Sequence, residues 1–287
     1  MVAGRGDRIY QAFIALFLLI VGLISVFPIL YVVSVSITPF SEVIKHGGFL
    51  IIPRSVTFEA YRHLLTDPAS LLPGAFGISV QVTVIGTVVN LVLNALLAFA
   101  LSKKGMPLRS AMLFFVVFTM LFNGGLIPTY LIVKSTGLLN TIWSLIVPTA
   151  VAAFNVLLMK SFFENLPEEL FESAHLDGAT EFSQLTRIAL PLSLPVIATV
   201  GLFYMVGHWN VFLQAVLYIS NPDLQPLQVV VRKMLLAMQE VDSQRAAVPA
   251  LTMRMAAIVL VSLPVIAVYP FLQKYFTQGM LIGAVKG

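Results

Sequence analysis

Acidic side chains are concentrated in one short part of an otherwise apolar chain. Six of the 13 Asp and Glu residues lie within residues 164–181. An enzyme embedded in a membrane would need acids, histidines or nucleophiles gathered on one helix face, and no such set is present in the sequence. The nearest match to a Walker A Lys-Ser pair is Lys134-Ser135, but Val133 stands where the glycine should be. We therefore expect no catalytic residues and no ATP hydrolysis by this chain.

The acidic region instead predicts two short helices joined by a turn. Asn165 is expected to cap the first helix, with Pro167 and Glu168 in its first turn, where carboxylates interact favourably with the helix dipole. Gly178 is expected to end that helix, because glycine adopts the left-handed conformation easily. Thr180 can cap the second helix, and Leu190-Pro191 is expected to end it. The apolar residues of this second helix that should share one face are Phe182, Leu185, Ile188 and Ala189.

An isolated pair of helices this short is marginal in water, so the segment needs a surface to pack on. One possibility is that it lies on the bilayer or on the protein's own helices, as amphipathic segments often do. The other possibility is a partner protein.

Most of the remaining chain is suited to lipid. The chain has 287 residues, of which 59% are hydrophobic and 10% charged, whereas soluble domains carry about 25% charged residues. Six intervals lack any charge, and the shortest, Met255–Gln273, has 19 residues. About 20 apolar residues in a helix cross a hydrocarbon core of about 30 Å, and these runs are unlike barrel strands. The sequence therefore predicts an all-α membrane protein as a single domain, with six transmembrane helices near residues 12–36, 76–101, 110–133, 140–162, 193–219 and 252–273.

Charge in the short loops predicts the orientation of these helices. Lys103, Lys104 and Arg109 lie between the second and third helices, and Arg5 and Arg8 precede the first. Because basic loops stay inside, both termini and residues 164–191 are expected to be cytoplasmic. The first helix is longer than a signal-peptide core, so we expect it to be retained.

Two longer segments are expected on the outer side. Residues 38–75 contain a short helix predicted near residues 58–65, and residues 220–250 contain a helical pattern after Pro222 and Pro226. Asn123-Gly124-Gly125 followed by Pro128 should bend or unwind the third helix.

The net charge of +4 is spread over many loops and predicts no nucleic-acid partner. Cysteine is absent, which excludes disulfides and thiolate metal sites, and no metal or cofactor is predicted.

The acidic segment also resembles a known motif. Glu172-Ser173-Ala174, three residues, Gly178, nine residues, Ile188, one residue and Leu190-Pro191 match the spacing of the EAA loop of ABC importer permeases. Ser173 stands where that family usually has alanine, a small change in size. In that family the loop is a coupling helix that sits in a cleft of the ATPase subunit. The resemblance thus implies ATPase coupling by Glu172, Ser173, Ala174, His175, Leu176, Asp177, Gly178, Ala179, Ile188, Leu190 and Pro191.

Further motifs resemble the carbohydrate branch, the maltose-type second permease subunit. They are P-x3-TFEAY at residues 53–61, Trp209-Asn210 with Phe212, and the C-terminal GAVKG. Val211 replaces the acid that is usual in the fifth-helix motif. Residues 226–228 and Arg232 resemble the subgroup that handles complex oligosaccharides.

The resemblance implies a permease subunit of an ATP-driven oligosaccharide importer in a bacterial cell membrane. Its partners would be a second homologous permease, forming a heterodimer, two ATPase subunits, an extracellular sugar-binding protein and membrane lipid. An amino-acid or other small-solute ABC importer stays possible. An ion-coupled carrier is disfavoured, because no carboxylate lies within the six charge-free runs.

Polar residues inside the predicted membrane helices are candidates for a sugar path. Amides default to hydrogen bonds between helices, and tyrosine or tryptophan near helix ends often anchors the interface. His208 has no carboxylate nearby and is expected to be packed and hydrogen-bonded rather than a proton relay. The residues predicted to line the path are Asn123, Tyr204, Trp209, Asn210 and Gln214.

Overall fold

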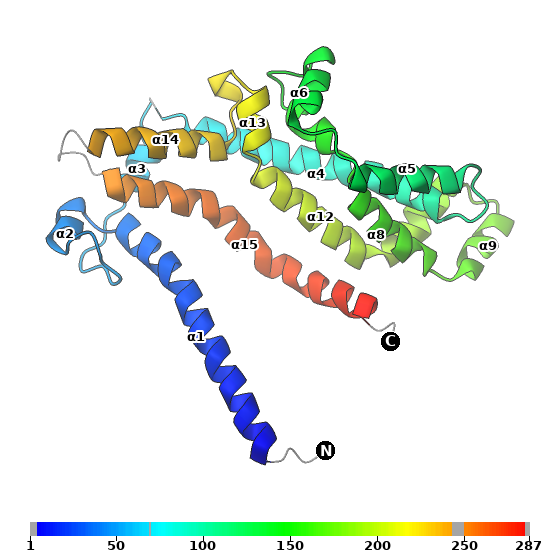
Figure 1. Ribbon diagram of the computed structural model, residues 1–287, viewed down its shortest axis with the longest axis horizontal. Coiled ribbons are helices and arrows are strands. Elements are labelled where there is room, and N and C mark those ends of the chain that lie inside the picture. The colour runs from blue at the N-terminus through cyan, green and yellow to red at the C-terminus, as the bar shows by residue number, and fades with distance from the viewer. Residues whose placement is uncertain (1–4, 69, 243–249, 285–287) are drawn as a thin grey trace. The chain divides into compact units, whose positions relative to one another are not determined.

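The computed structural model describes residues 5–68, 70–242 and 250–284, and all regular elements in these ranges are helices (Figure 1). The α-helices are α1 (Arg5–Ser36), α2 (Phe40–Lys45), α3 (Glu59–Thr66), α4 (Leu72–Ser102), α5 (Arg109–Leu121), α6 (Leu126–Ser135), α7 (Trp143–Ile146), α8 (Ala153–Glu164), α9 (Glu168–Leu176), α10 (Glu181–Gln184), α11 (Leu190–Leu192), α12 (Leu194–Trp209), α13 (Leu213–Tyr218), α14 (Leu227–Asp242) and α15 (Ala250–Ala284). Two short 3₁₀ helices, η1 (Val147–Thr149) and η3 (Pro222–Leu224), and one π-helical turn, η2 (Leu185–Ala189), complete them.

The chain divides into two compact units. One contains the residues up to Leu72 and Val231–Leu263, and the other contains Pro73–Val230 and the residues from Pro264 onward. In the first unit, the hydroxyl of Tyr31 on α1 donates a 2.8 Å hydrogen bond to the carbonyl of Gly48, and its ring stacks on Phe49. These contacts fold the segment that follows α1 back onto that helix. The short helix predicted near residues 58–65 is confirmed as α3.

The described helices provide up to six membrane spans, in agreement with the prediction. Three single helices are long and apolar enough to cross a membrane, at Tyr10–Ser36, Leu72–Ser102 and Leu251–Val268. Three further spans would each be a bent pair: α5 with α6 at 119°, α7–η1 with α8 at 55°, and the α10–α11 run with α12 at 86°. The predicted break of the third helix is confirmed, because α5 ends at Leu121 and α6 begins at Leu126.

The prediction that the fourth and fifth membrane helices are continuous was wrong. The fourth, 140–162, tightens into η1 around Pro148, which has no N–H to donate, and unwinds before α8 begins at Ala153. The fifth, 193–219, ends at Trp209, and α13 begins only at Leu213. The side chain of Asn210 donates a 2.9 Å hydrogen bond to the carbonyl of Val206, which is how such residues commonly compete with a helix.

Side chains from two neighbouring helices occupy the break before α8. The side-chain amide of Asn94 on α4 donates a 2.8 Å hydrogen bond to the carbonyl of Ala150, and that of Asn90 donates one of 3.4 Å to the carbonyl of Thr149. From α12, the hydroxyl of Tyr204 accepts a 3.1 Å bond from the backbone N–H of Ala152. In a membrane, backbone groups that are released from a helix need such partners. These side chains therefore stabilise the break in the second unit.

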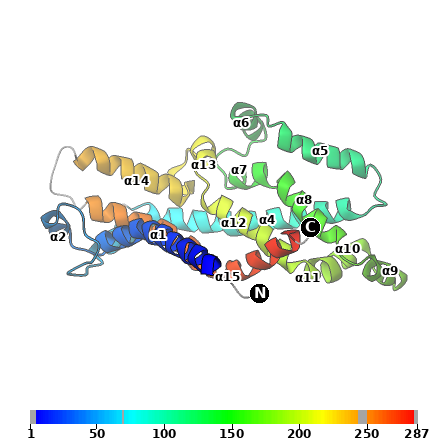
Figure 2. The same ribbon diagram turned by 60° about the horizontal axis from the view of Figure 1, so that its bottom comes forward.

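Two apolar clusters form the core of the second unit. The first joins α4, α8, η2 and α12, and its buried residues are Ala95, Ala98, Phe99, Leu101, Val156, Met159, Phe163, Leu185, Ala189, Val196, Val200 and Tyr204. The second joins the first half of α4 to α6, α7, α13 and the start of α14, and its buried residues are Val82, Val133, Leu145, Ile146, Val211, Ala215, Tyr218, Ile219 and Val229. Figure 2 shows α9–α11 at one end of this unit and α13 toward the other.

The side chain of His208 on α12 lies against α4 at a glycine. A Cβ atom built on Gly86 would lie 2.6 Å from Nε2 of His208, which is closer than real Cβ contacts. That same Nε2 atom accepts a 2.9 Å hydrogen bond from the side-chain amide of Asn90. His208 is therefore packed and hydrogen-bonded, as expected from the sequence, and residue 86 must be small.

We predict that Gly86→Ala destabilises the protein while Gly77→Ala, in the same helix, does not. The new methyl group would force the His208 ring away from Asn90, and overpacking of this kind costs about 1–3 kcal/mol. Gly77 has no heavy atom within 4 Å of a built Cβ, so alanine there should be neutral or stabilising through helix propensity. The thermal midpoints of the detergent-solubilised variants measure this, and equal midpoints would contradict it.

Candidate functional site

The acidic region, residues 164–191, forms the two short helices that the sequence predicts, and we call it the coupling segment. Its first helix, α9, begins at Glu168, and Pro167 occupies the capping position without a side-chain hydrogen bond. The prediction of Asn165 as the cap was wrong. A residue that precedes proline is disfavoured in helical conformation, so Leu166 cannot form the first turn. Asn165 instead ends α8, and its side-chain amide donates a 2.7 Å hydrogen bond to the carbonyl of Ser161.

The turn between the two helices depends on Gly178. Its φ is +79°, as the sequence predicts. The N–H of Gly178 donates to the carbonyl of His175 at 3.0 Å, and the N–H of Ala179 donates to the carbonyl of Ala174 at 2.8 Å. This pair of bonds is the Schellman arrangement that ends a helix. No heavy atom lies within 4 Å of a Cβ built on Gly178, so only the backbone conformation requires glycine.

The second helix begins at the predicted cap and ends later than predicted. Oγ1 of Thr180 accepts a 3.3 Å hydrogen bond from the N–H of Ser183, which confirms Thr180 as the cap. The helix runs on through η2 and α11 and breaks at Ser193, so Leu190-Pro191 does not end it. Proline is tolerated in the first turn of α11, where its missing N–H is not needed.

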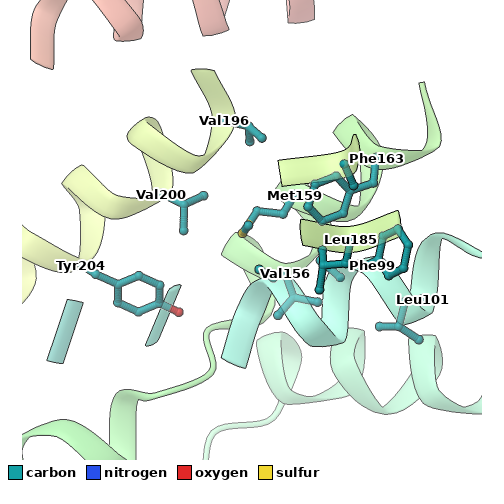
Figure 3. Packing of buried hydrophobic residues seen from close by; sticks show 12 residues of the cluster. Phe99, Leu101, Val156, Met159, Phe163, Leu185, Val196, Val200 and Tyr204 are labelled. Atoms are coloured by element: carbon teal, nitrogen blue, oxygen red, sulfur yellow. The ribbon is translucent and has the colours of Figure 1, made fainter. Parts of the chain in front are cut away.

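One side of this second helix is buried in the first apolar cluster. Leu185 and Ala189 are 3% and 0% exposed, and Figure 3 shows Leu185 among side chains of α4, α8 and α12. Phe182, which was predicted to share their face, is 67% exposed, so that part of the prediction was wrong. Leu185 and Ala189 lie four residues apart within η2, whereas Phe182 precedes η2 on α10. The second helix is thus anchored to three membrane helices.

The opposite side of the coupling segment is uncovered. Leu176, just before the Gly178 turn, is 88% exposed, and Phe182 follows shortly after it. Two large apolar side chains therefore flank an exposed turn of fixed geometry. Such an arrangement can bind a complementary surface of another protein.

Acids of the coupling segment pair with bases that lie outside it. Glu164 accepts hydrogen bonds from Arg109 at 2.5 Å and from Lys160 at 2.8 Å. Residues 103–108 form the link between α4 and α5, and Arg109 is the first residue of α5. In that same link, Lys104 pairs with Glu168 and Lys103 pairs with Glu181, both at 3.3 Å. The acidic region is therefore held against a basic link.

A polar cavity of about 360 Å³ separates part of the link from the coupling segment. Both sides contribute charged residues to its wall. The lining residues are Ser102, Lys103, Lys104, Phe163, Glu164, Leu166, Glu168, Phe171, Glu172, His175, Glu181 and Gln184. No group of three His, Asp or Glu residues that could hold a metal ion occurs in the described ranges.

A second cavity, of about 330 Å³, brings together three of the five predicted path residues. Tyr204, Asn210 and Gln214 line it, together with Thr149 and His208. Its wall therefore presents hydroxyl, amide and imidazole groups beside a broken span, which could hydrogen-bond a polar solute.

The other two predicted path residues lie elsewhere. Asn123 is exposed in the break between α5 and α6, where its Oδ1 accepts a 2.9 Å hydrogen bond from the N–H of Gly125. Trp209 is 5% exposed and packs edge-on against Phe76, and its carbonyl accepts a hydrogen bond from Gln228. Neither residue lines the second cavity.

Two kinds of site residue were missed in the sequence. Lys103 and Arg109 served there only to predict orientation. Their pairing could have been inferred, because a basic loop and an acidic loop on the same side of a membrane attract each other. Thr149 follows Pro148, whose missing N–H was a signal for the break that places Thr149 beside the cavity.

The fold and this segment define a class of membrane protein. Over residues 4–282 the chain matches the family described as binding-protein-dependent transport system inner membrane component, and it belongs to that family. The predicted resemblance to ABC importer permeases is thereby confirmed, and the protein is a multi-pass membrane protein.

Individual relatives match along almost their whole length. Protein LplC of Bacillus subtilis (strain 168) is 44% identical, over 99% of this chain and 97% of LplC. The polygalacturonan/rhamnogalacturonan transport system permease protein YtcP of the same organism is 41% identical, over 98% and 99%. A chain in the crystal structure of a bacterial ABC transporter involved in the import of the acidic polysaccharide alginate superposes with a TM-score of 0.88 at 32% identity, covering 96% of this chain and 99% of that chain.

We predict that Glu164→Gln loosens the coupling segment. The change removes a carboxylate that neutralises two largely buried cations, because the side chains of Arg109 and Lys160 are 25% and 16% exposed. Hydrogen bonds to charged groups contribute about 1.5–3 kcal/mol, so amide hydrogen exchange in residues 165–190 should become about tenfold faster or more. Glu169→Gln is the matched control, because Glu169 is exposed and forms no ion pair among the described residues. Equal exchange in both variants would contradict the prediction.

Proposed function

We propose that this chain is one of two permease subunits of an ATP-driven importer, and that the coupling segment docks on an ATPase subunit. The observation that carries the proposal is that the segment has one side buried in the membrane helices and another side exposed. Leu185 and Ala189 anchor it in the membrane helices, whereas Leu176 and Phe182 flank an exposed turn. Membership of the binding-protein-dependent transport family supports this role.

In this mechanism the chain makes and breaks no bonds, and ATP is hydrolysed on the separate ATPase subunits. When ATP brings the two ATPase subunits together, each carries a coupling segment with it. The π-helical turn then passes the movement to α12 and the first apolar cluster. Residues proposed to take part are Glu172, Ser173, Ala174, His175, Leu176, Asp177, Gly178, Ala179, Ile188, Leu190 and Pro191.

The substrate proposed is an oligosaccharide. The name of YtcP specifies polygalacturonan/rhamnogalacturonan transport, the alginate transporter is named for import of an acidic polysaccharide, and both align along nearly all of this chain. Sugars are bound through hydroxyl, amide and aromatic groups, and the second cavity offers these at Tyr204, Asn210 and Gln214. Asn123 and Trp209 would contact the sugar outside that cavity.

The assembly proposed contains a second homologous permease, two ATPase subunits and an extracellular sugar-binding protein, in the plasma membrane of a bacterium. Both termini and the coupling segment would face the cytoplasm, and the two compact units would act as a single transmembrane domain. Residues 220–250 would contact the binding protein. Within that stretch, η3 and α14 are described, and residues 243–249 lie outside the described ranges.

We predict that Gly178→Val uncouples transport without preventing membrane insertion. Valine resists a φ of +79°, and the left-handed conformation costs about 1–2 kcal/mol for a residue with a Cβ, so the two helices would meet at a different angle. The membrane helices do not depend on this turn. Co-purification of the ATPase subunits, or sugar uptake per ATP hydrolysed, should fall at least fivefold.

Gly178→Asn is the matched control, because asparagine adopts the left-handed conformation more readily than other residues with a side chain. It should retain most of the uptake. Wild-type values for both measurements in Gly178→Val would mean that the segment does not couple.

Orientation gives a separate test. The chain contains no cysteine, so single cysteines at Gly105 in the basic link and at Asp223 in η3 can be labelled selectively. We expect a membrane-impermeant thiol reagent added to intact cells to label position 223, and to reach position 105 only after the cells are permeabilised. Labelling of both positions from outside would contradict the proposed cytoplasmic location of the link.

A further inference from the structure

Lys103, at the start of the link after α4, contacts both helices of the coupling segment. Its Nζ donates a 2.8 Å hydrogen bond to Oε1 of Gln184 and lies 3.3 Å from a carboxylate oxygen of Glu181, both on α10. Gln184 is only 2% exposed, so Lys103 satisfies a buried amide oxygen. Hydrogen bonds from a charged donor are stronger than neutral ones, especially where water is excluded.

The same ammonium group lies over two aromatic rings from different helices. Nζ is 4.7 Å from the ring centroid of Phe99 on α4 and 4.4 Å from that of Phe171 on α9. Both distances are within the range of cation–π attraction. The two rings are themselves 6.1 Å apart, so Lys103 joins α4, α9 and α10 at one point.

The other ion pairs of the link are placed differently. The side chains of Lys104 and Glu168 are 80% and 70% exposed, and such surface pairs contribute little. Arg109 binds Glu164, which lies at the end of α8 before either helix of the coupling segment begins. Next to Lys103, the cavity of about 360 Å³ interrupts direct packing between the link and the segment. Lys103 bridges this gap with a side chain that is 31% exposed.

We infer that Lys103 is a positioning residue that ties both helices of the coupling segment to the end of α4, so that a movement of the segment reaches this span as well as α12. The inference rests on the proposed function of the segment. It extends that function by adding a second route into the membrane, through the link between α4 and α5. Without Lys103, α9 could shift into the cavity while η2 stayed anchored, and ATPase movement would be partly lost.

The test compares three variants in the complete importer with its binding protein. Lys103→Met keeps the length and the apolar stem but removes the charge, Lys103→Arg keeps the charge, and Lys104→Met is the matched control. The measured quantity is sugar taken up per ATP hydrolysed in vesicles. We expect Lys103→Met to assemble with the ATPase subunits and to lose at least fivefold in this ratio. Lys103→Arg should recover at least half of it, and Lys104→Met should stay within twofold of wild type.

A distance measurement tests the same inference without transport. Spin labels on cysteines at Gly105 in the link and Glu169 on α9 report the separation across the cavity, since the chain has no cysteine of its own. The distribution of distances should be narrow in wild type and in Lys103→Arg, and broader in Lys103→Met.

An unchanged distribution, or a wild-type uptake ratio in Lys103→Met, would overturn the inference. Loss of assembly in Lys103→Met would also overturn it, because Lys103 would then be required for folding. If the importer with the unchanged chain showed no ATP-dependent sugar uptake, that result would contradict the proposed function. The spin-label distances would then still decide the role of Lys103.

Discussion

The need to give every backbone polar group a partner inside the membrane governs the second unit. A continuous helix meets that need by itself, but the span formed by α7, η1 and α8 is interrupted. Asn90, Asn94 and Tyr204 supply the missing hydrogen bonds from α4 and α12. Asn90 also donates a hydrogen bond to Nε2 of His208, whose ring lies so close to α4 that residue 86 must be small. The buried amides of Asn90 and Asn94 at the break therefore follow from this requirement.

Electrostatic attraction explains why an apolar chain keeps so many acids together. Glu164 pairs with Arg109 and Glu181 pairs with Lys103, and these pairs help to hold the coupling segment at the end of α4, whereas the exposed pair of Lys104 and Glu168 contributes little. Apolar contact comes from η2, where Leu185 and Ala189 enter the first cluster, and from Phe171 of α9, which packs against that cluster. A segment held in this way can present Leu176 and Phe182 outward, as a docking element requires. Burial of those two side chains would have removed the surface that a partner needs.

The relatives and the side-chain geometry inform different questions. Similarity to LplC, YtcP and the alginate transporter chain establishes the family along nearly the whole sequence. The contacts show how individual residues are used. Tyr204 was predicted as a sugar contact, and its hydroxyl accepts a hydrogen bond from the broken span, so it supports the wall of the cavity as well as lining it. A change at this residue would alter the shape of the cavity together with any contact to a solute.

The sequence by itself determined the features that depend on neighbouring residues. The spans were predicted from long charge-free runs, the positive φ at position 178 from its glycine, and the helix cap at position 180 from its threonine. Each of these features follows from residues that are neighbours in the sequence. Only the tertiary structure decided that η2 buries Leu185 and leaves Phe182 exposed, and that Lys103 meets Gln184 across 81 positions of sequence. The break between α5 and α6 was predicted from Asn123-Gly124-Gly125 and Pro128, but the breaks before α8 and after α12 belong to this second group, since an interrupted span is stable only when other helices supply its hydrogen bonds. Such partners are distant in sequence, and folding alone brings them together.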